Sequence, residues 1–214
     1  ALAAGLTGRT PRYGLHLDQN RKATRRFHVT VQPAELTDWG VLGAVIGRMA
    51  GSYWEVPVIE GIERVPTSDE IKHFGAAMAS YGSIPLFHMI GITPEASNLA
   101  AVGGTNLPVT HITKTDLASL RSDFASKGER PDVVVFAAPQ LSIVEMEQVA
   151  RLVDGHKLQL PLIVCTSPQT YGDAGRMGFI DKIEKAGGTV LEGTCFYNQY
   201  AREIGEASGW VRLL

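Results

Sequence analysis

Residues 132–137 read DVVVFA, an almost unbroken run of apolar residues rich in β-branched side chains. Such a run is typical of a strand that is buried on both faces of a parallel sheet. A second run of the same character, LPLIVC, covers residues 160–165. Between the two runs, residues 142–154 have the pattern of a helix that Ser142 opens as its N-cap. Together these segments predict a βαβ unit with parallel strands.

The same alternation extends in both directions along the chain. Downstream, a helix over 175–186 is expected to end at Gly187-Gly188, and a strand follows over 189–193. Upstream, the patterns predict strands over 27–32, 56–60 and 84–90 and helices over 39–49, from 66 to about 80, and from 115 to about 127. Thr37 or Asp38, Thr67 or Ser68, and Thr115-Asp116 are the expected caps of these helices, and a loop is expected over 93–110.

This regular alternation predicts an α/β fold of layered βαβ units with mainly parallel sheets and right-handed crossovers. Residues 1–110 are interpreted as one βαβαβ block preceded by a substrate-loop segment. Residues 111–214 are interpreted as a second βαβαβ block, which carries both cysteines.

Composition narrows the class of protein but does not name a function. The chain has 214 residues, of which 44% are hydrophobic and 20% are charged, and its formal net charge is −2. These values are typical of a globular protein and give no reason to expect nucleic acid or an acidic membrane surface as a partner. No apolar run reaches about 18 residues, so no transmembrane helix is expected.

The two ends of the sequence suggest a piece of a longer polypeptide. Residues 1–6 read like the interior of a helix, and the last five residues, WVRLL, stop without a polar tail. The alternative interpretation is a complete domain from which a tag has been removed.

The two cysteines carry the most chemical information. Cys165 and Cys195 each fall at the carboxyl end of a predicted strand, and ligands of open α/β sheets bind outside the carboxyl ends of the strands. If one crossover helix joins the two strands, they lie parallel and adjacent, and both cysteines are expected to face one cavity. The alternative is that each cysteine is a small buried packing residue. Two cysteines form no disulfide framework and suit a reducing cytoplasm, and metal binding or redox chemistry stays open.

Two polar segments are further candidates. Residues 8–21 read GRTPRYGLHLDQNR, an irregular stretch rich in groups that bind carboxylates or move protons, although a solvated loop would look the same. His88 lies in a predicted apolar strand, with Thr93 and Glu95 just beyond it, and a satisfied core histidine is the alternative there. No Walker A or GxGxxG pattern is present.

Six ordered segments resemble the aconitase X family, and the likeness covers nearly the whole chain. They read GLTGRTPRYGLHLDQNR (5–21), GSIPLFH (82–88), GITPEA (91–96), VFAAPQLS (135–142), VCTS (164–167) and GTC (193–195). The resemblance implies an aconitase-like fold and an iron–sulfur dehydratase. Known activities in the family are dehydration of cis-3-hydroxy-L-proline and of mevalonate 5-phosphate.

The resemblance also implies roles for particular residues. Cys165 and Cys195 would be two ligands of the iron–sulfur cluster, with a third cysteine supplied from outside this chain. His16, Asn20, Arg21 and Ser167 would bind the small-molecule substrate, and no residue is identified as the catalytic base. The family's large region is about twice this length, and a small swivelling domain or subunit closes its site. The chain alone is therefore expected to be inactive.

One departure bears on the substrate. Several members of the family carry Cys and His around the position of Pro139, where this chain has Ala138 and Gln140. This leaves a two-iron or a four-iron cluster open and, with no phosphate cradle in the sequence, favours cis-3-hydroxy-L-proline over mevalonate 5-phosphate. Two other classes stay open: a cofactor-free α/β binding domain, and a redox or thiol enzyme that uses one of the cysteines.

Overall fold

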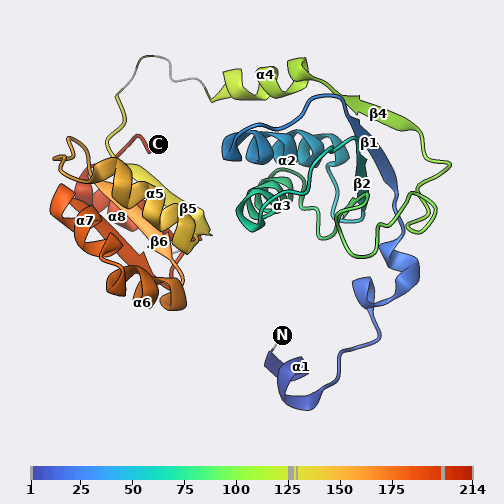
Figure 1. Ribbon diagram of the computed structural model, residues 1–214, viewed down its shortest axis with the longest axis horizontal. Coiled ribbons are helices and arrows are strands. Elements are labelled where there is room, and N and C mark those ends of the chain that lie inside the picture. Colours follow the sequence, from blue (N-terminus) through green and yellow to red (C-terminus); the bar gives the residue numbers. More distant parts are fainter. Residues whose placement is uncertain (1, 125–127, 129, 199–200, 214) are drawn as a thin grey trace. The chain divides into compact units, whose positions relative to one another are not determined.

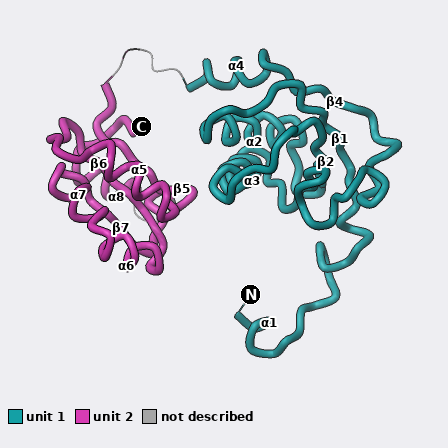
Figure 2. Tube along the Cα trace, in the orientation of Figure 1, with its two compact units in different colours: residues 1–125 teal, residues 126–214 magenta. Residues whose placement is uncertain are grey.

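The computed structural model describes residues 2–124, 128, 130–198 and 201–213, and the chain divides into two units, residues 1–125 and 126–214 (Figure 2). The division lies beyond the expected boundary between residues 110 and 111. The reason is that β4 (Val109–Ile112) joins the first sheet and α4 (Lys114–Asp123) packs against α2 (Leu36–Ala50) of the first unit. Each unit contains one parallel sheet, which confirms the predicted α/β class.

The sheet of the first unit has the strand order β3-β2-β1-β4, and all its pairs are parallel. Its other strands are β1 (Arg25–Val29), β2 (Pro57–Glu60) and β3 (His88–Met89). β4 begins inside the segment that was expected to be a loop over 93–110, so that prediction was wrong at its end. Only Ile112 of this edge strand is buried, and it therefore lacks the apolar run that marks a central strand.

Two long helices cover one face of this sheet, α2 (Leu36–Ala50) and α3 (Ser68–Gly82), and they lie side by side (Figure 1). A Cβ atom placed on Gly43 would lie 2.1 Å from the main-chain oxygen of Phe74. Gly43 and Gly47, which weaken α2 as a helix, thus allow its close contact with α3.

The helix caps agree in part with the expectations. Thr67 is the N-cap of α3, as expected, and its side chain accepts a hydrogen bond from the Glu70 main-chain N–H. α2 instead has Glu35 at its N-cap, and Asp38 lies in the first turn, where its carboxylate accepts from the N–H of Glu35 at 3.0 Å. α4 has Thr113 at its N-cap, ahead of the expected pair.

The segment before β1 contains three short helices, α1 (Leu2–Thr7), η1 (Gly14–His16) and η2 (Asp18–Arg21). The helical character expected for the first residues is therefore confirmed in α1. Of the helices within the described part of the chain, none is both long enough and apolar enough to span a bilayer.

The second unit has the sheet order β5-β6-β7, again all parallel. Its elements are β5 (Val134–Leu141), α5 (Ile143–Val153), β6 (Leu162–Thr166), α6 (Pro168–Arg176), α7 (Phe179–Ala186), β7 (Gly188–Glu192), η3 (Phe196–Asn198) and α8 (Ala201–Ser208). The expected single crossover helix over 175–186 is two helices. Gly178 separates them with a left-handed backbone, φ 76°.

Side chains alternate between the two faces of β6. Leu162 and Val164 pack with α5, α6 and α7, while Ile163 and Cys165 pack on the opposite face with Phe196. This alternation, which is the ordinary two-residue period of a strand, directs Cys165 toward the segment that follows β7.

Candidate functional site

The two cysteines lie at the carboxyl ends of adjacent strands. Cys165 lies near the end of β6 and is 0% exposed. In the parallel pair of β6 and β7 it stands opposite Leu191, and Cys195 lies in the loop just past β7. The predicted adjacency of the two strands is therefore confirmed.

Burial and nearby charge both act on the ionisation of the Cys165 thiol. Burial raises the pKa of the Cys165 thiol, and the Cys195 thiolate raises it further. The main-chain N–H of Phe196 opposes this shift by donating a hydrogen bond to the Cys165 sulfur. The pKa of Tyr197 is raised by burial and by the charges of both cysteines. Both thiols are free in this structure.

Short hydrogen bonds connect the ends of the three strands around the cysteines. The buried hydroxyl of Thr166 donates to the Leu141 main-chain oxygen at 2.6 Å. The Gly193 N–H donates to the Thr166 main-chain oxygen at 2.9 Å. The Gln140 side chain donates to the main-chain oxygen of Thr194 at 2.8 Å. The loop that carries Cys195 is thus hydrogen-bonded to both β5 and β6.

Ser167 immediately follows β6 and is the N-cap of α6. Its hydroxyl oxygen accepts a hydrogen bond from the Thr170 N–H at 3.1 Å. This contact satisfies one of the free N–H groups at the start of the helix. The structure therefore gives Ser167 a capping contact, and its predicted contact with a substrate stays a prediction.

The donor set near the cysteines fits part of a metal centre. Thiolates are the ligands that iron–sulfur clusters use, and two thiols are present at this strand end. Within the described residues, no group of three or more His, Cys, Asp or Glu side chains is placed to hold a metal ion. The two cysteines therefore fit a cluster only if further ligands come from elsewhere.

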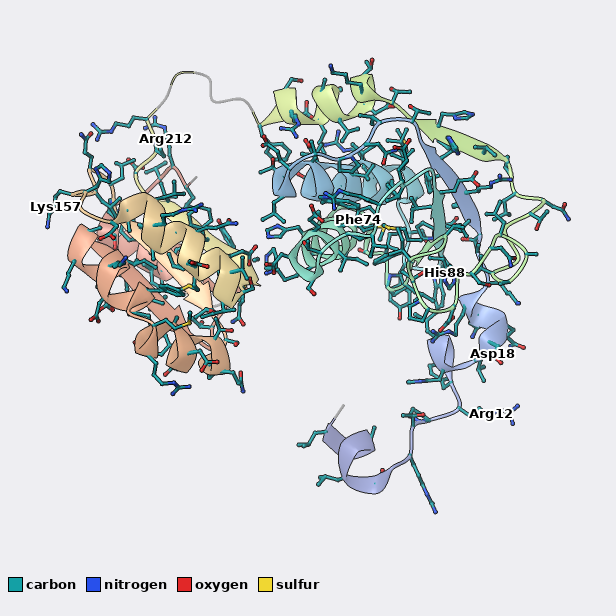
Figure 3. The ribbon with its side chains drawn as sticks, in the orientation of Figure 1. Arg12, Asp18, Phe74, His88, Lys157 and Arg212 are labelled. Carbon is teal, nitrogen blue, oxygen red and sulfur yellow. The ribbon has the colours of Figure 1, made fainter. Side chains whose placement is uncertain are left out.

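A polar cavity of about 600 Å³ lies in the first unit. Asp18 on η2 and His88 on β3 come from neighbouring parts of this unit (Figure 3). The lining side chains include both acids and bases: His16, Asp18, Arg21, Lys22, His88 and Glu95. The cavity thus brings together His16 and Arg21, two of the residues predicted from the sequence.

Arg21 is held in place by two neighbours. Its Nε donates to Glu95 Oε2 at 2.9 Å, and a second nitrogen pairs with the other oxygen of that carboxylate. A third nitrogen donates to the Leu15 main-chain oxygen at 3.0 Å. Such a bidentate contact fixes a guanidinium group firmly. The sequence marks Glu95 as a polar residue just beyond a predicted strand, but nothing in the sequence indicates its pairing with Arg21.

His88 contacts the main chain of Arg21. It is 2% exposed, and its Nε2 is 2.7 Å from the main-chain oxygen of Arg21. Because a carbonyl oxygen only accepts, Nε2 is the donor in this contact. His88 is thus a satisfied buried histidine that also lines the cavity.

Asn20 is directed to a different place. Its side chain donates to the Gly14 main-chain oxygen at 2.8 Å. It lines a separate cavity of about 400 Å³ whose wall includes Tyr13, Tyr53 and Trp54. The structure therefore does not bring Asn20 to the cavity that His16 and Arg21 share.

The chain is an α/β protein with parallel sheets that carries two thiols at the ends of adjacent strands. Comparisons with known proteins identify its family. The family model described as "Aconitase X second domain" matches residues 23–122, and "Aconitase X third domain" matches residues 131–211. The chain belongs to the aconitase X family, as the sequence motifs predicted.

Two curated relatives and one solved structure illustrate the likeness. A phosphomevalonate dehydratase large subunit of Methanothermobacter thermautotrophicus is 35% identical over 206 residues, which are 96% of this chain and 50% of that protein. A cis-3-hydroxy-L-proline dehydratase of Hypocrea jecorina is 33% identical over 206 residues, which are 91% of this chain and 34% of that protein. The chain thus spans half of the first relative and about a third of the second.

The solved structure is the holo-form of aconitase X from Thermococcus kodakaraensis. It superposes with a TM-score of 0.80 at 29% sequence identity and covers 100% of this chain and 58% of its own. This agreement confirms the expected aconitase-like fold.

Proposed function

We propose that this chain is part of an iron–sulfur hydro-lyase that dehydrates a small hydroxy acid. The observation that carries the proposal is the placement of the two free thiols, Cys165 at the end of β6 and Cys195 just past the adjacent parallel strand β7. The family relationship supports it, because curated relatives of both kinds are named dehydratases. Thiols that only fill a core have no need to lie within reach of each other.

In this proposal Cys165 and Cys195 are two ligands of the cluster, and a further ligand comes from outside the 214 residues. When bound, the cluster supplies an iron that acts as a Lewis acid toward the substrate hydroxyl. The protein's part is to hold the two thiolates. The Phe196 N–H stabilises the thiolate of Cys165, and burial of that side chain keeps water away from it.

The polar cavity of the first unit is proposed to bind the substrate's charged groups. Arg21 and Lys22 supply two positive charges, and Asp18 and Glu95 supply two negative charges, so the lining is balanced. Because Arg21 is occupied by Glu95, His16 and Lys22 are the groups that can receive a carboxylate, and Asp18 can receive an ammonium group. A balanced lining suits a zwitterion.

This balance favours cis-3-hydroxy-L-proline as the substrate. Mevalonate 5-phosphate carries a carboxylate and a phosphate, and a phosphate alone brings about −1.5 to −2 charges at neutral pH. It would call for an excess of cations that this cavity does not have. It stays as the second candidate, because several curated relatives are named phosphomevalonate dehydratase large subunits.

The names of those relatives also support a partner. They are called large subunits, and we place a small subunit or a small swivelling domain beside this chain in the active protein. A reducing cytoplasm suits the assembly, because both cysteines must stay as thiols to bind iron. Activity is accordingly expected from the whole protein and not from the 214-residue chain.

The test is made on the whole protein, purified without oxygen together with any small subunit. Iron and sulfide analysis and the visible spectrum should report a cluster, and Cys165→Ser and Cys195→Ser should each lose it while circular dichroism stays unchanged. Steady-state kcat/KM for the two substrates then decides between them. A colourless, iron-free protein that folds normally would overturn the cluster, and a higher kcat/KM for the phosphate ester would overturn the choice of substrate.

A further inference from the structure

We infer that Gln140 is a positioning residue for Cys195, because its side-chain amide fastens the loop that carries this cysteine to the end of β5. The inference rests on the proposed function in taking Cys195 as a cluster ligand. The contact itself is a property of this chain alone. It joins two residues that are 54 positions apart in sequence, at a distance of 2.8 Å.

The placement of Gln140 follows from an irregularity in β5. The register between β5 and β6 is regular up to Phe136 opposite Val164, shifts, and resumes at Leu141 opposite Thr166. Such irregularities bend a strand and re-aim its side chains. Here the irregular stretch includes Gln140, whose side chain is half-buried and crosses to the loop after β7.

The loop is held on both sides of Cys195. On one side, the main-chain oxygen of Thr194 accepts the Gln140 amide, and on the other, the N–H of Phe196 donates to the Cys165 sulfur. Phe196 is also buried in the core beside Cys165. Because Phe196 is anchored by packing as well, the Gln140 contact is the more easily removed of the two.

The chemistry of the contact explains why glutamine suits this position. A main-chain oxygen only accepts, so its partner must be a donor. A carboxylate would be acceptor-only at neutral pH and would add a negative charge beside two thiolates, which raises thiol pKa values. The neutral amide supplies the donor and adds no charge beside the cysteines.

The inference is tested by alkylating the native 214-residue chain with iodoacetamide and following each cysteine by mass spectrometry from pH 7 to 10. Gln140→Met keeps the length and neutrality of the side chain but removes the donor. A net hydrogen-bond contribution of ~0.5–1.5 kcal/mol corresponds to alkylation of Cys195 about two- to tenfold faster. The acceleration should be the same at every pH tested, since the access of the reagent changes, and Cys165 should keep its wild-type rate.

Two further variants make the test specific. Gln32→Met is the matched control, because Gln32 makes the same kind of contact in the first unit, to the main-chain oxygen of Gly61 at 2.7 Å. It should leave both cysteines unchanged. Gln140→His keeps a neutral N–H donor and should restore the wild-type rate. If Gln140→Met does not fold, Gln140→Asn replaces it, because the amide is one methylene too short to reach.

A Cys195 rate in folded Gln140→Met equal to that of wild type would overturn the inference, as would equal acceleration by Gln140→Met and Gln140→His. Iron analysis of the whole protein separates this result from the proposed function. If the rates respond as expected but the wild-type whole protein binds no iron, the role of Gln140 in placing the loop stands and the cluster proposal fails. If the whole protein carries a cluster but the cysteine rates do not change in Gln140→Met, the cluster proposal stands and the inference about Gln140 fails.

Discussion

His88 Nε2 and the main-chain oxygen of Arg21 lie 2.7 Å apart, although 67 positions separate the two residues in sequence. The contact ties the irregular segment before β1 to β3. It also makes Nε2 of His88 the donor, since a carbonyl oxygen only accepts. The fixed position of η2, and with it the orientation of Arg21 toward Glu95, therefore depends on a residue of the sheet.

Replacing this histidine should destabilise the first unit. His88→Phe leaves the Arg21 main-chain oxygen without its donor in a buried setting, and such a loss costs about 1–3 kcal/mol. Urea denaturation followed by circular dichroism measures it. His16→Gln is the matched control, because His16 lines the same cavity but is exposed, and it should change stability by less than ~0.5 kcal/mol. Equal stability of His88→Phe and wild type would show that this contact is not structural.

The contact between α2 and α3 gives a prediction with an internal control. Gly43→Ala places a Cβ atom 2.1 Å from the Phe74 main-chain oxygen, so the helices must move apart, at a cost of about 3 kcal/mol or more. Gly40→Ala lies in the same helix with nothing within 4 Å of the new atom, and it should stabilise by up to about 1 kcal/mol. Thermal unfolding of both variants should show a lower melting temperature for Gly43→Ala and a higher one for Gly40→Ala. A stabilised Gly43→Ala would contradict the packing.

Glu70 makes the first unit sensitive to acid. Its hydrogen bonds with the Arg64 guanidinium, helped by the Thr67 N–H, lower the pKa of this carboxyl from 4.5 to about 2. Because the folded-state pKa lies below the unfolded one, ionised Glu70 stabilises the fold above about pH 4.5 and loses this contribution as the pH falls toward 2. The lowering from 4.5 to about 2 corresponds to about 3 kcal/mol, and solvent screening at the half-exposed Arg64 reduces the effect to about 2 kcal/mol.

The comparison of wild type with Glu70→Gln checks this window. The wild-type chain should lose more of its unfolding free energy between pH 4.5 and pH 2 than the variant does, and the two should run parallel above pH 6. Parallel curves over the whole range would mean that Glu70 is not held ionised by Arg64.

The two cysteines should differ in reactivity in the wild-type chain. Cys165 is fully buried and its thiol pKa is raised, whereas Cys195 is half-buried. A local opening that costs only ~1.4 kcal/mol slows a buried thiol tenfold, so Cys195 should be alkylated at least about ten times faster. Mass spectrometry of the native chain measures both rates, and urea should make them equal. Faster labelling of Cys165 than of Cys195 would contradict the burial of the Cys165 side chain.

The parts of the fold that were predictable from sequence are those with strong local signals. The apolar run ending at Cys165 marks β6, the central strand of its sheet, which is buried at every position. The run ending at Ala137 also marks a strand, but β5 lies at the edge of the sheet and Phe136 is 45% exposed, so the expected burial on both faces was wrong there. Ser142 and Thr67 mark helix starts because a hydroxyl there satisfies free N–H groups. β4 gave no such signal, because it is an edge strand with one buried residue, and Gly178 divided a helix that looked continuous.

The candidate site was predictable to a similar degree. The adjacency of the strands before Cys165 and Cys195 followed from βαβ geometry. The pairing of Arg21 with Glu95 did not, because it joins residues 74 positions apart through the folding of irregular segments. Asn20 lay in the same motif as Arg21 but belongs to another cavity, since neighbours in a 3₁₀ turn point in different directions.

The late position of β4 in the chain has a consequence for biosynthesis. β1 pairs with β4, and the Thr30 N–H donates to the Ile112 main-chain oxygen across 82 positions. A ribosome that adds roughly 5–20 residues per second needs several seconds to make that stretch. For this time one edge of β1 in the nascent chain has no strand to pair with, and open edges invite pairing with other chains. Translation speed between β1 and β4 should therefore govern how much of the newly made protein aggregates.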